Sequence, residues 1–321
     1  MPPSPIVNMG NTCYMSACLQ ILDTLDIVND SLIASARANR IRSVKGSLLS
    51  TWLDTRNSLQ DGRLFRPEAM AATLKAESAK RGVEEFGGDK QQDAHELFIF
   101  ILDAIHEEIE REVTMTVTGT AKSAKDELAL RCYKEYRRHF AKSFSEIVKL
   151  TRSMEVTVVN DASTGRRLTL SSDPMSNLSL YVMPGRWELS DLVSSYCAAS
   201  IVEDVDDEQG GKTTANRQIF FWSLPSVLII HLQKDYSGPS LVTFPVDDLD
   251  MSKNVIGYKP TSYVYQLQGV LYHRGTRRGG HYIAAVRRGS DWYLCDDERI
   301  TRTRPVDLIS EYAYCLFYTR K

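Results

Sequence analysis

The sequence predicts an α+β fold in which helices come first along the chain and strands follow. Two observations support this prediction. Up to about residue 112, apolar side chains recur at the three- and four-residue spacing of amphipathic helices. Beyond about residue 140, short runs of β-branched and aromatic residues between turn residues become the dominant pattern. Helices and strands that are segregated in this way indicate an α+β protein and not an alternating α/β one.

Three helices are predicted in the first part of the chain. One begins at Cys13, after which apolar residues recur at helical spacing. A second begins at Pro67, a residue favoured at the first helical position, and ends before Gly82. The third and strongest covers residues 90–113, with Asp89 as its N-cap. Its apolar stripe consists of Ala94, Leu97, Phe98, Ile101, Ile105 and Ile109.

Strands are predicted in the second part of the chain, because short β-prone runs alternate there with turn residues. They cover residues 154–159, 167–170, 176–182, 220–232, 263–272, 282–286, 291–295 and 314–318. The mostly apolar run at residues 226–232 is typical of a buried strand. Residues 203–211 are acidic and end in two glycines, which predicts an exposed, unstructured loop tip.

Composition and charge exclude several classes of protein. The chain has 321 residues, of which 43% are hydrophobic and 25% charged, so it can bury a large core without disulfides or metal. A formal net charge of −2 argues against a nucleic-acid partner. No apolar run approaches the roughly 18 residues that span a bilayer, so no membrane partner is expected either.

Cysteine usage predicts a reducing, intracellular location in the cytoplasm or nucleus. The sequence lacks CxxC pairs, and its first residues contain no apolar signal core. We therefore expect free thiols. The six cysteines are Cys13, Cys18, Cys132, Cys197, Cys295 and Cys315.

Cys13 is the candidate nucleophile of a cysteine hydrolase. It stands where a glycine-containing turn enters the first predicted helix. A helix N-terminus carries roughly half a positive charge and spare backbone N–H groups, so this placement predicts an acidified thiol. His281 and the acidic pair Asp296 and Asp297 supply the imidazole and the orienting carboxylate that such a hydrolase needs.

The spacing around His281 predicts which carboxylate orients it. Two short predicted strands flank residues 287–290. If those four residues form a hairpin loop, counting outward places His281 opposite Asp296, and directly opposed Cβ atoms are roughly 4.5–5.5 Å apart. A one-residue slip would bring Asp297 there instead. In this interpretation Asp296 holds the imidazole, His281 takes the thiol proton and Cys13 attacks.

Acyl transfer also needs donors for the developing oxyanion. The backbone N–H of Cys13 is one candidate, and an amide side chain just before it is the other. Asn8 and Asn11 both qualify by their chemistry, and the residues alone leave the choice open.

Five blocks, in order along nearly the whole chain, resemble the motifs of ubiquitin-specific proteases, the papain-like cysteine deubiquitinases. They are the cysteine box (8–15), the glutamine–aspartate helix motif (91–97), the central palm strand (224–232), the histidine box (273–297) and the closing strand (314–318). The resemblance implies a single papain-like catalytic domain over residues 1–321 with a right-hand architecture. Its helical thumb would cover about 1–135, its fingers 136–220 and its palm 221–321, with strands of fingers and palm interleaved.

The resemblance also implies an activity and roles for residues. The activity is thiol-dependent hydrolysis of the isopeptide or peptide bond after the C-terminal glycine of ubiquitin, through a thioester and without a cofactor. Motif positions make Cys13 the nucleophile, His281 the base and Asp296 the third member of the triad. They select Asn8 as the oxyanion amide, and they match Asp297 to a second acidic position that assists.

Substrate-binding residues follow from the same resemblance. Asp93 would contact the basic ubiquitin tail, and Gly279 and Gly280 would border the narrow channel for the terminal Gly-Gly, with Tyr282 beside them. Only a substrate without side chains can enter such a channel, so exclusion contributes to specificity. The implied partners are ubiquitin and ubiquitinated proteins, and the enzyme is expected to act as a monomer.

Two departures from the family pattern lead to separate expectations. Many members bind zinc in the fingers through two CxxC pairs, whereas here residues 144–159 contain no cysteine and the second region has only Cys197. Zinc needs about four ligands, so we expect zinc-free fingers and no metal site. Cys295 replaces the aromatic residue usual before the first aspartate, and residues 233–235 replace a basic-aromatic strand ending. The Cys295 change motivates one alternative, a catalytically silent ubiquitin-binding scaffold. A second alternative keeps the enzyme but makes its substrate a ubiquitin-like modifier.

Overall fold

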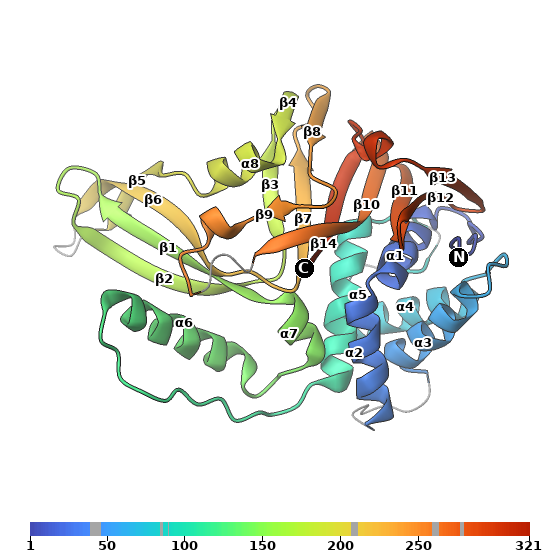
Figure 1. Ribbon diagram of the computed structural model, residues 1–321, viewed down its shortest axis with the longest axis horizontal. Helices are drawn as coiled ribbons and strands as arrows, with labels where there is room; N and C mark the ends of the chain where they lie inside the picture. The colour runs from blue at the N-terminus through green and yellow to red at the C-terminus, as the bar shows by residue number, and fades with distance from the viewer. Residues whose placement is uncertain (39–45, 84–85, 89, 207–210, 259–262, 277–278) are drawn as a thin grey trace.

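The computed structural model describes residues 1–38, 46–83, 86–88, 90–206, 211–258, 263–276 and 279–321. A group of helices lies beside two large β-sheets, and the helices come mostly from the first part of the chain (Figure 1). The predicted α+β class is therefore confirmed.

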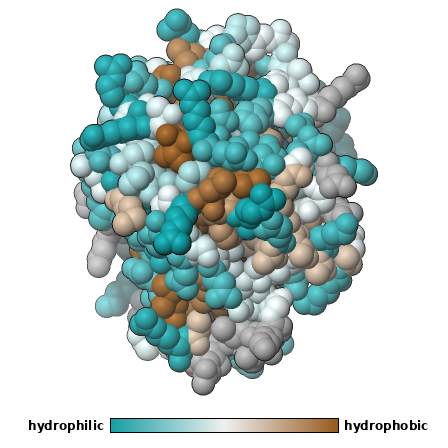
Figure 2. Space-filling view, turned by 90° about the vertical axis from the view of Figure 1, so that its right-hand side faces the viewer, coloured by the Kyte–Doolittle hydropathy of each residue, from teal (hydrophilic) through white to brown (hydrophobic). Residues whose placement is uncertain are grey.

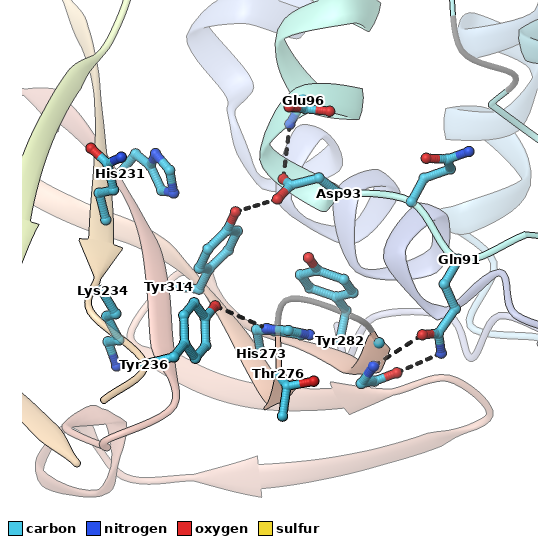
Figure 3. A pocket seen from close by; sticks show the side chains of 14 residues that line it. Gln91, Asp93, Glu96, His231, Lys234, Tyr236, His273, Thr276, Tyr282 and Tyr314 are labelled. Carbon is cyan, nitrogen blue, oxygen red and sulfur yellow. Dashed lines mark hydrogen bonds between the residues drawn. The ribbon is translucent and has the colours of Figure 1, made fainter. Parts of the chain in front are cut away.

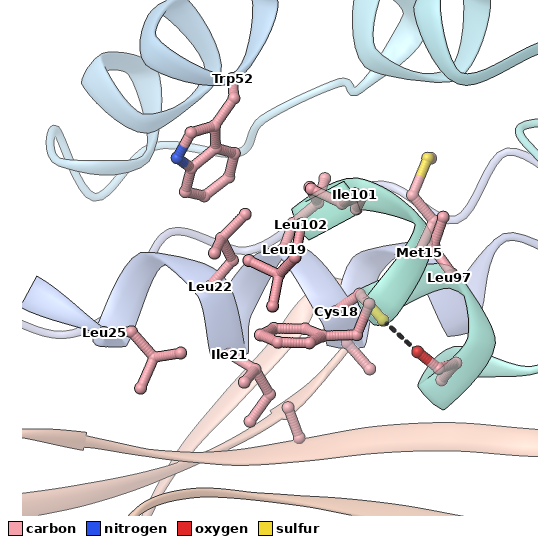
Figure 4. Close-up of a cluster of buried hydrophobic side chains, with 14 of the residues drawn as sticks. Met15, Cys18, Leu19, Ile21, Leu22, Leu25, Trp52, Leu97, Ile101 and Leu102 are labelled. Carbon is pink, nitrogen blue, oxygen red and sulfur yellow. Dashed lines mark hydrogen bonds between the residues drawn. The ribbon is translucent and has the colours of Figure 1, made fainter. Parts of the chain in front are cut away.

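The thumb consists of five helices, of which the first is enclosed by its neighbours. These are α1 (Cys13–Thr24), α2 (Asp26–Arg37), α3 (Leu48–Leu59), α4 (Glu68–Arg81) and α5 (Ala94–Ile109). Every residue of α1 is buried, because the helix packs against α5 on one side and the large sheet on the other. Trp52 of α3 and Ile101 and Leu102 of α5 lie around its apolar side chains (Figure 4).

The third predicted helix is shorter than expected. The structure starts α5 at Ala94, and its N-cap is Asp93, whose carboxylate accepts hydrogen bonds from the backbone N–H groups of His95 (2.7 Å) and Glu96 (3.1 Å). The predicted cap, Asp89, lies outside the described residues. A carboxylate that satisfies two otherwise unpaired N–H groups fixes the helix start better than the apolar periodicity does.

The start of α4 also differs slightly from the prediction. Pro67 is the N-cap, so the helix begins one residue later, at Glu68. Its end agrees with the prediction, because Gly82 follows in the left-handed conformation (φ +63°) that glycine adopts without strain.

The fingers are a four-stranded antiparallel sheet in the order β2-β1-β6-β5, at the left of Figure 1. The strands are β1 (Ser153–Asp161), β2 (Arg167–Met175), β5 (Ser200–Asp206) and β6 (Lys212–Ser223). Helix α6 (Ala124–Phe140) covers one face, where Cys132 packs with Met154 and Val156. This helix falls largely within the predicted thumb range, yet it contacts the fingers.

The predicted acidic loop tip is wrong in its first half. Residues 203–206 belong to β5, which pairs with β6 through, for example, Val202 and Ala215. Residues 207–210 lie outside the described residues. β5 is an edge strand, and exposed charges are common on edge strands because they discourage pairing with other chains. Its acidic composition therefore did not indicate a loop.

The palm is an eight-stranded sheet in the order β13-β12-β11-β10-β14-β7-β3, with β9 pairing to β10. Its strands are β3 (Leu178–Val182), β7 (Val227–Lys234), β9 (Leu249–Asp250), β10 (Val264–Thr276), β11 (Gly279–Arg288), β12 (Asp291–Asp296), β13 (Arg299–Thr303) and β14 (Ala313–Arg320). The remaining elements are α7 (Glu146–Thr151), α8 (Leu189–Tyr196), the parallel pair β4 (Gly185–Glu188) and β8 (Ser240–Thr243), and 3-10 turns at Ser252–Asn254 and Pro305–Leu308.

Strand β7 is buried on both faces of the palm, as its apolar run predicted. Ile229 faces the core that the palm shares with the thumb, whereas its neighbours Leu228 and Ile230 face a second core under α8. Successive side chains of a strand point to opposite faces, so a strand covered on both sides needs apolar residues throughout. The palm is thus a rigid layer on which the thumb helices are fixed.

The surface on the right-hand side of Figure 1 is mostly hydrophilic, with hydrophobic residues in small groups (Figure 2). Among the described residues, the helices are all too short or too polar to cross a membrane.

Candidate active site

Cys13 is the first residue of α1, and only 2% of its surface is exposed. The turn before it is shaped by Asn8, whose side-chain oxygen accepts hydrogen bonds from the backbone N–H groups of Gly10 and Thr12, both at 3.1 Å. Gly10 (φ +99°) and Asn11 (φ +56°) take the left-handed conformations that the tight turn requires. The placement of this cysteine at a helix start is as the sequence predicted.

The expected acidification of the Cys13 thiol is not found. Burial raises the pKa of the thiol above its ordinary value, and the negative charge of Asp297 raises it further. Backbone N–H groups, that of Tyr282 foremost, lower the pKa but do not compensate. The pKa is raised because the helix terminus that favours a thiolate is itself buried, so the thiolate would lose its hydration there.

This environment predicts how the thiol reacts with iodoacetamide in the enzyme without substrate. Because the thiolate is the reactive form, a raised pKa means that the alkylation rate keeps climbing from about pH 7 to about pH 9. Alkylation at each pH, followed by mass spectrometry with Cys13→Ala as the background, measures this. A rate that is already flat below neutral pH would show a preformed thiolate and contradict the prediction.

His281 and Asp296 are in direct contact, with 2.6 Å between Nε2 and the carboxylate oxygen Oδ1. The predicted register, however, is wrong by two residues. The hairpin loop is only Gly289 and Ser290, since Arg288 pairs with Asp291. Gly289 has φ +61°, which suits the first position of a two-residue turn.

The contact survives this error because side-chain direction in a strand repeats every two residues. When the observed register is extended by one position, Asp296 lies opposite Ile283 and diagonal to His281. Diagonal neighbours are roughly 7–8 Å apart at the backbone, within reach of an imidazole and a carboxylate on the same face.

Asp297 makes a different contact from its neighbour. It occupies the turn after β12 with φ +51°, and its Oδ2 accepts a hydrogen bond from Nδ2 of Asn8 at 2.9 Å. The same oxygen is 4.0 Å from Nε2 of His281. Burial raises the pKa of Asp297, whereas the Asn8 hydrogen bond and the charge of His281 lower it. Asp296 thus orients the imidazole of His281, whereas Asp297 orients the side-chain amide of Asn8.

Residues far apart in the sequence therefore meet at one place. The segment at residues 6–13 lies against the β12–β13 turn, where the backbone N–H of Ile6 also donates to the carbonyl of Asp297. The backbone N–H of Tyr282, the residue after His281, donates a hydrogen bond to the Cys13 thiol. Asn11 is exposed in the preceding turn, and it is Asn8 that donates to Asp297.

A cavity of about 460 Å³ lies beside these residues, between thumb and palm (Figure 3). All four predicted substrate-binding residues, Asp93, Gly279, Gly280 and Tyr282, line it. Asp93 is already engaged: besides capping α5, it accepts a hydrogen bond from the Tyr314 hydroxyl.

The sequence prediction missed several residues that line the same cavity. They are Gln91, Gln92, Glu96, His231, Gln233, Lys234, Tyr236, His273, Thr276 and Tyr314. Among them, His231 and His273 border the cavity together with Tyr314. These three side chains stand on β7, β10 and β14, which are adjacent in the sheet, and the sequence motifs carry no signal of that adjacency.

His281, Asp296 and Asp297 also form the one cluster of potential metal ligands among the described residues, with their ligand atoms within 4.8 Å of one another. Each of these residues takes part in the contacts above, through Nε2 of His281, Oδ1 of Asp296 and Oδ2 of Asp297.

Comparison with known proteins identifies the family. The family model described as "Ubiquitin carboxyl-terminal hydrolase" matches residues 5–318. Ubiquitin carboxyl-terminal hydrolase 12 of Saccharomyces cerevisiae is 42% identical over 118 residues, which are 33% of this chain and 9% of that protein. Human ubiquitin carboxyl-terminal hydrolase 15 is 37% identical over 116 residues, 33% of this chain and 12% of that protein. The matched regions are thus about a tenth of the relatives' length.

Solved structures support the same fold. The chain is similar over its whole length to a chain in the SAGA DUB module of Ubp8, Sgf11, Sus1 and Sgf73 bound to ubiquitin aldehyde, with a TM-score of 0.75, 20% identity and 72% of that chain covered. The same module bound to monoubiquitin gives a TM-score of 0.73 with 71% covered. The resemblance noted in the sequence motifs is confirmed: the chain belongs to the ubiquitin carboxyl-terminal hydrolase family.

Proposed function

We propose that this chain is a cysteine deubiquitinase that hydrolyses the isopeptide or peptide bond after the C-terminal glycine of ubiquitin. The principal observation in its favour is the contact of His281 with Asp296 at 2.6 Å, beside a cysteine at a helix start. Membership of the family and the likeness to a module solved with ubiquitin aldehyde support the choice of substrate.

The geometry suggests how the proton moves. Asp296 accepts the hydrogen bond of Nε2, which leaves Nδ1 of His281 to take the proton of the Cys13 thiol. Sγ then bonds to the glycine carbonyl carbon, and the resulting tetrahedral intermediate expels the amine, which takes the proton back from His281. A water molecule next attacks the thioester as His281 removes its proton, and the carboxylate leaves while the thiol is regenerated.

Asn8 is proposed as an oxyanion donor together with the Cys13 backbone. One N–H of its amide is held by Asp297, so the amide plane is fixed and the second N–H of Nδ2 remains for the substrate oxygen. The turn hydrogen bonds to its Oδ1 fix the other end of the amide. Because Cys13 stands in the first turn of α1, its backbone N–H has no intrahelical acceptor and adds a second donor.

The cavity between thumb and palm is proposed as the site of the ubiquitin tail. A Cβ atom on Gly280 would lie 2.4 Å from Nε2 of His273 and 2.6 Å from the carbonyl of Arg274, so this wall has no room for a side chain. Asp93 and Glu96 give the thumb side an acidic character that suits a basic tail.

No cofactor is assigned, and the residues of the fingers do not suit zinc. The four finger strands contain no cysteine, and burial raises the pKa of Cys132 and of Cys197 to about 11, which disfavours the thiolates that zinc needs. We expect metal analysis of the purified protein to find no stoichiometric zinc. About one zinc per chain, removed by a chelator with loss of folded structure, would contradict this.

Partners, assembly and location are proposed with the activity: ubiquitin and ubiquitinated proteins bind a single catalytic domain that acts as a monomer inside the cell. All six cysteines are free thiols in the structure, which suits a reducing compartment.

A ubiquitin probe with an electrophile at its C-terminus tests the proposed function. The folded chain should form a covalent adduct at Cys13 and release ubiquitin from isopeptide-linked conjugates, and the Cys13→Ala variant should do neither. Probes built on ubiquitin-like modifiers, used in parallel, should label more slowly. Binding of ubiquitin without labelling would favour a silent scaffold, and faster labelling by another modifier would change the substrate.

A further inference from the structure

A pair of hydrogen bonds joins thumb and palm at the edge of the cavity. The side chain of Gln91, from the segment before α5, donates through Nε2 to the carbonyl of Gly280 at 2.6 Å. Its Oε1 accepts the backbone N–H of the same residue at 2.9 Å. Figure 3 shows both bonds beside Tyr282. We call this two-bond contact between Gln91 and Gly280 the clasp.

The clasp forms part of the cavity wall, in the same strand as the residue that contacts the thiol. The lining of the cavity includes Gln91 and Gly280 but not Cys13. Along β11, Gly280 precedes His281 and Tyr282, and Tyr282 is the residue whose backbone N–H reaches the Cys13 thiol. A tail that extends along β11 from the cavity to Cys13 therefore runs beside the clasp.

Glycine is what allows the clasp to form. A Cβ atom on Gly279 would lie 2.7 Å from Oε1 of Gln91, and one on Gly280 would meet His273 and Arg274. Gln91 itself is exposed, so water competes for its amide and the two bonds are individually weak. The contact is thus one that can open and close readily.

The proposed substrate makes opening necessary. In an isopeptide conjugate the tail is a continuous chain between two folded bodies, ubiquitin and its target. A domain of about 100 residues has a radius of gyration of about 13 Å, so neither body can be threaded through a channel that fits one extended chain. The tail must be laid in from the side, between the thumb and the palm that the clasp joins.

We propose that Gln91 is a substrate-entry residue: its clasp with Gly280 closes the route from the cavity to Cys13 in the free enzyme and opens when the tail is laid in sideways. This inference rests on the proposed function. An extended tail offers the same backbone N–H and C=O groups as Gly280, so the amide of Gln91 can exchange one partner for the other. The apparent association rate constant is then the intrinsic one multiplied by the fraction of time for which the clasp is open.

Association kinetics of two Gln91 variants test the proposal. In a Cys13→Ala background, Gln91→Ala removes both bonds, and Gln91→Glu removes the donor to the Gly280 carbonyl. Both should bind isopeptide-linked diubiquitin about fivefold faster than the parent, the effect expected from losing two weak hydrogen bonds. Gln266→Ala, a glutamine whose side chain bonds Asp247 away from the cavity, is the matched control and should leave the rate unchanged. Ubiquitin that lacks its tail should associate equally with all variants.

Hydrogen exchange gives a readout that does not depend on binding. The Gly280 amide should exchange faster in Gln91→Ala than in the parent, while the melting temperature stays the same because Gln91 lies outside α5. Unchanged diubiquitin association in both variants, or slower association that marks Gln91 as a plain substrate contact, would overturn the clasp. If the unmodified chain neither binds diubiquitin nor cleaves it, the proposed function fails instead, and exchange at Gly280 still reports whether the clasp exists.

Discussion

Replacing Cys13 by alanine is expected to abolish hydrolysis of ubiquitin conjugates while ubiquitin affinity stays within a few-fold. The side chain is the proposed nucleophile, and loss of a nucleophile from a hydrolase triad typically lowers kcat by about 10⁶-fold. It is also 98% buried, since its exposed fraction is 2%, so it offers almost no surface to a bound tail. Rate and affinity should therefore separate.

The measurement compares turnover of a fluorogenic ubiquitin amide with equilibrium binding of diubiquitin. Cys197→Ala is a suitable control for the loss of a cysteine, because Cys197 is half-buried at the end of α8, where its carbonyl accepts a hydrogen bond from Gln218 of the fingers, and it does not line the cavity. It should keep normal turnover. If affinity in Cys13→Ala falls as far as the rate does, the thiol is a binding or folding element and the proposed mechanism is wrong.

Asn8→Ala should lower kcat by about 10²–10³, or about 2.7–4 kcal/mol of transition-state stabilisation, with a smaller change in KM. The amide is fixed at both ends, by Asp297 on its nitrogen and by the backbone of Gly10 and Thr12 on its oxygen. A donor that is already oriented stabilises an oxyanion without reorganising, which is why its removal affects the transition state more than the ground state.

Asn11→Gly is the matched control for this variant. Asn11 has the same side chain and lies in the same turn, and glycine preserves its left-handed backbone (φ +56°). We expect its kcat to stay close to that of the parent. A large loss in Asn11→Gly with none in Asn8→Ala would move the oxyanion role to the second asparagine, the alternative that the residue chemistry alone left open.

Local patterns predicted the elements of this fold better than their exact pairing. Apolar periodicity located α1 and α5, Pro67 and Gly82 located α4, and the burial of β7 on both faces was predicted by its apolar run. The hairpin before Asp296 was misjudged by two residues, because Arg287 and Arg288 look like loop residues and are strand residues. Only the positive φ of Gly289, which depends on the folded turn, reveals the tighter loop.

The motifs predicted contacts within the candidate site but not its electrostatics. Cys13, His281, Asp296 and Asn8 were named from motif positions, the structure shows the contacts His281–Asp296 and Asn8–Asp297, and the catalytic roles stay a prediction. The raised pKa of the thiol was not predictable, because it depends on how closely β11 and the turn at Asp297 pack over the helix start. The histidines and tyrosines of the cavity were missed for a related reason: their neighbourhood is created by strand order in the sheet, which short motifs do not record.

The position of β14 has a consequence for the life of the protein in the cell. Its residues, 313–320, lie between β7 and β10 in the middle of the palm (Figure 1). During translation, two halves of that layer stay apart until this late stretch has left the ribosome and bridged them. The cavity bordered by His231 of β7, His273 of β10 and Tyr314 of β14 therefore takes its final form only when the bridging strand docks.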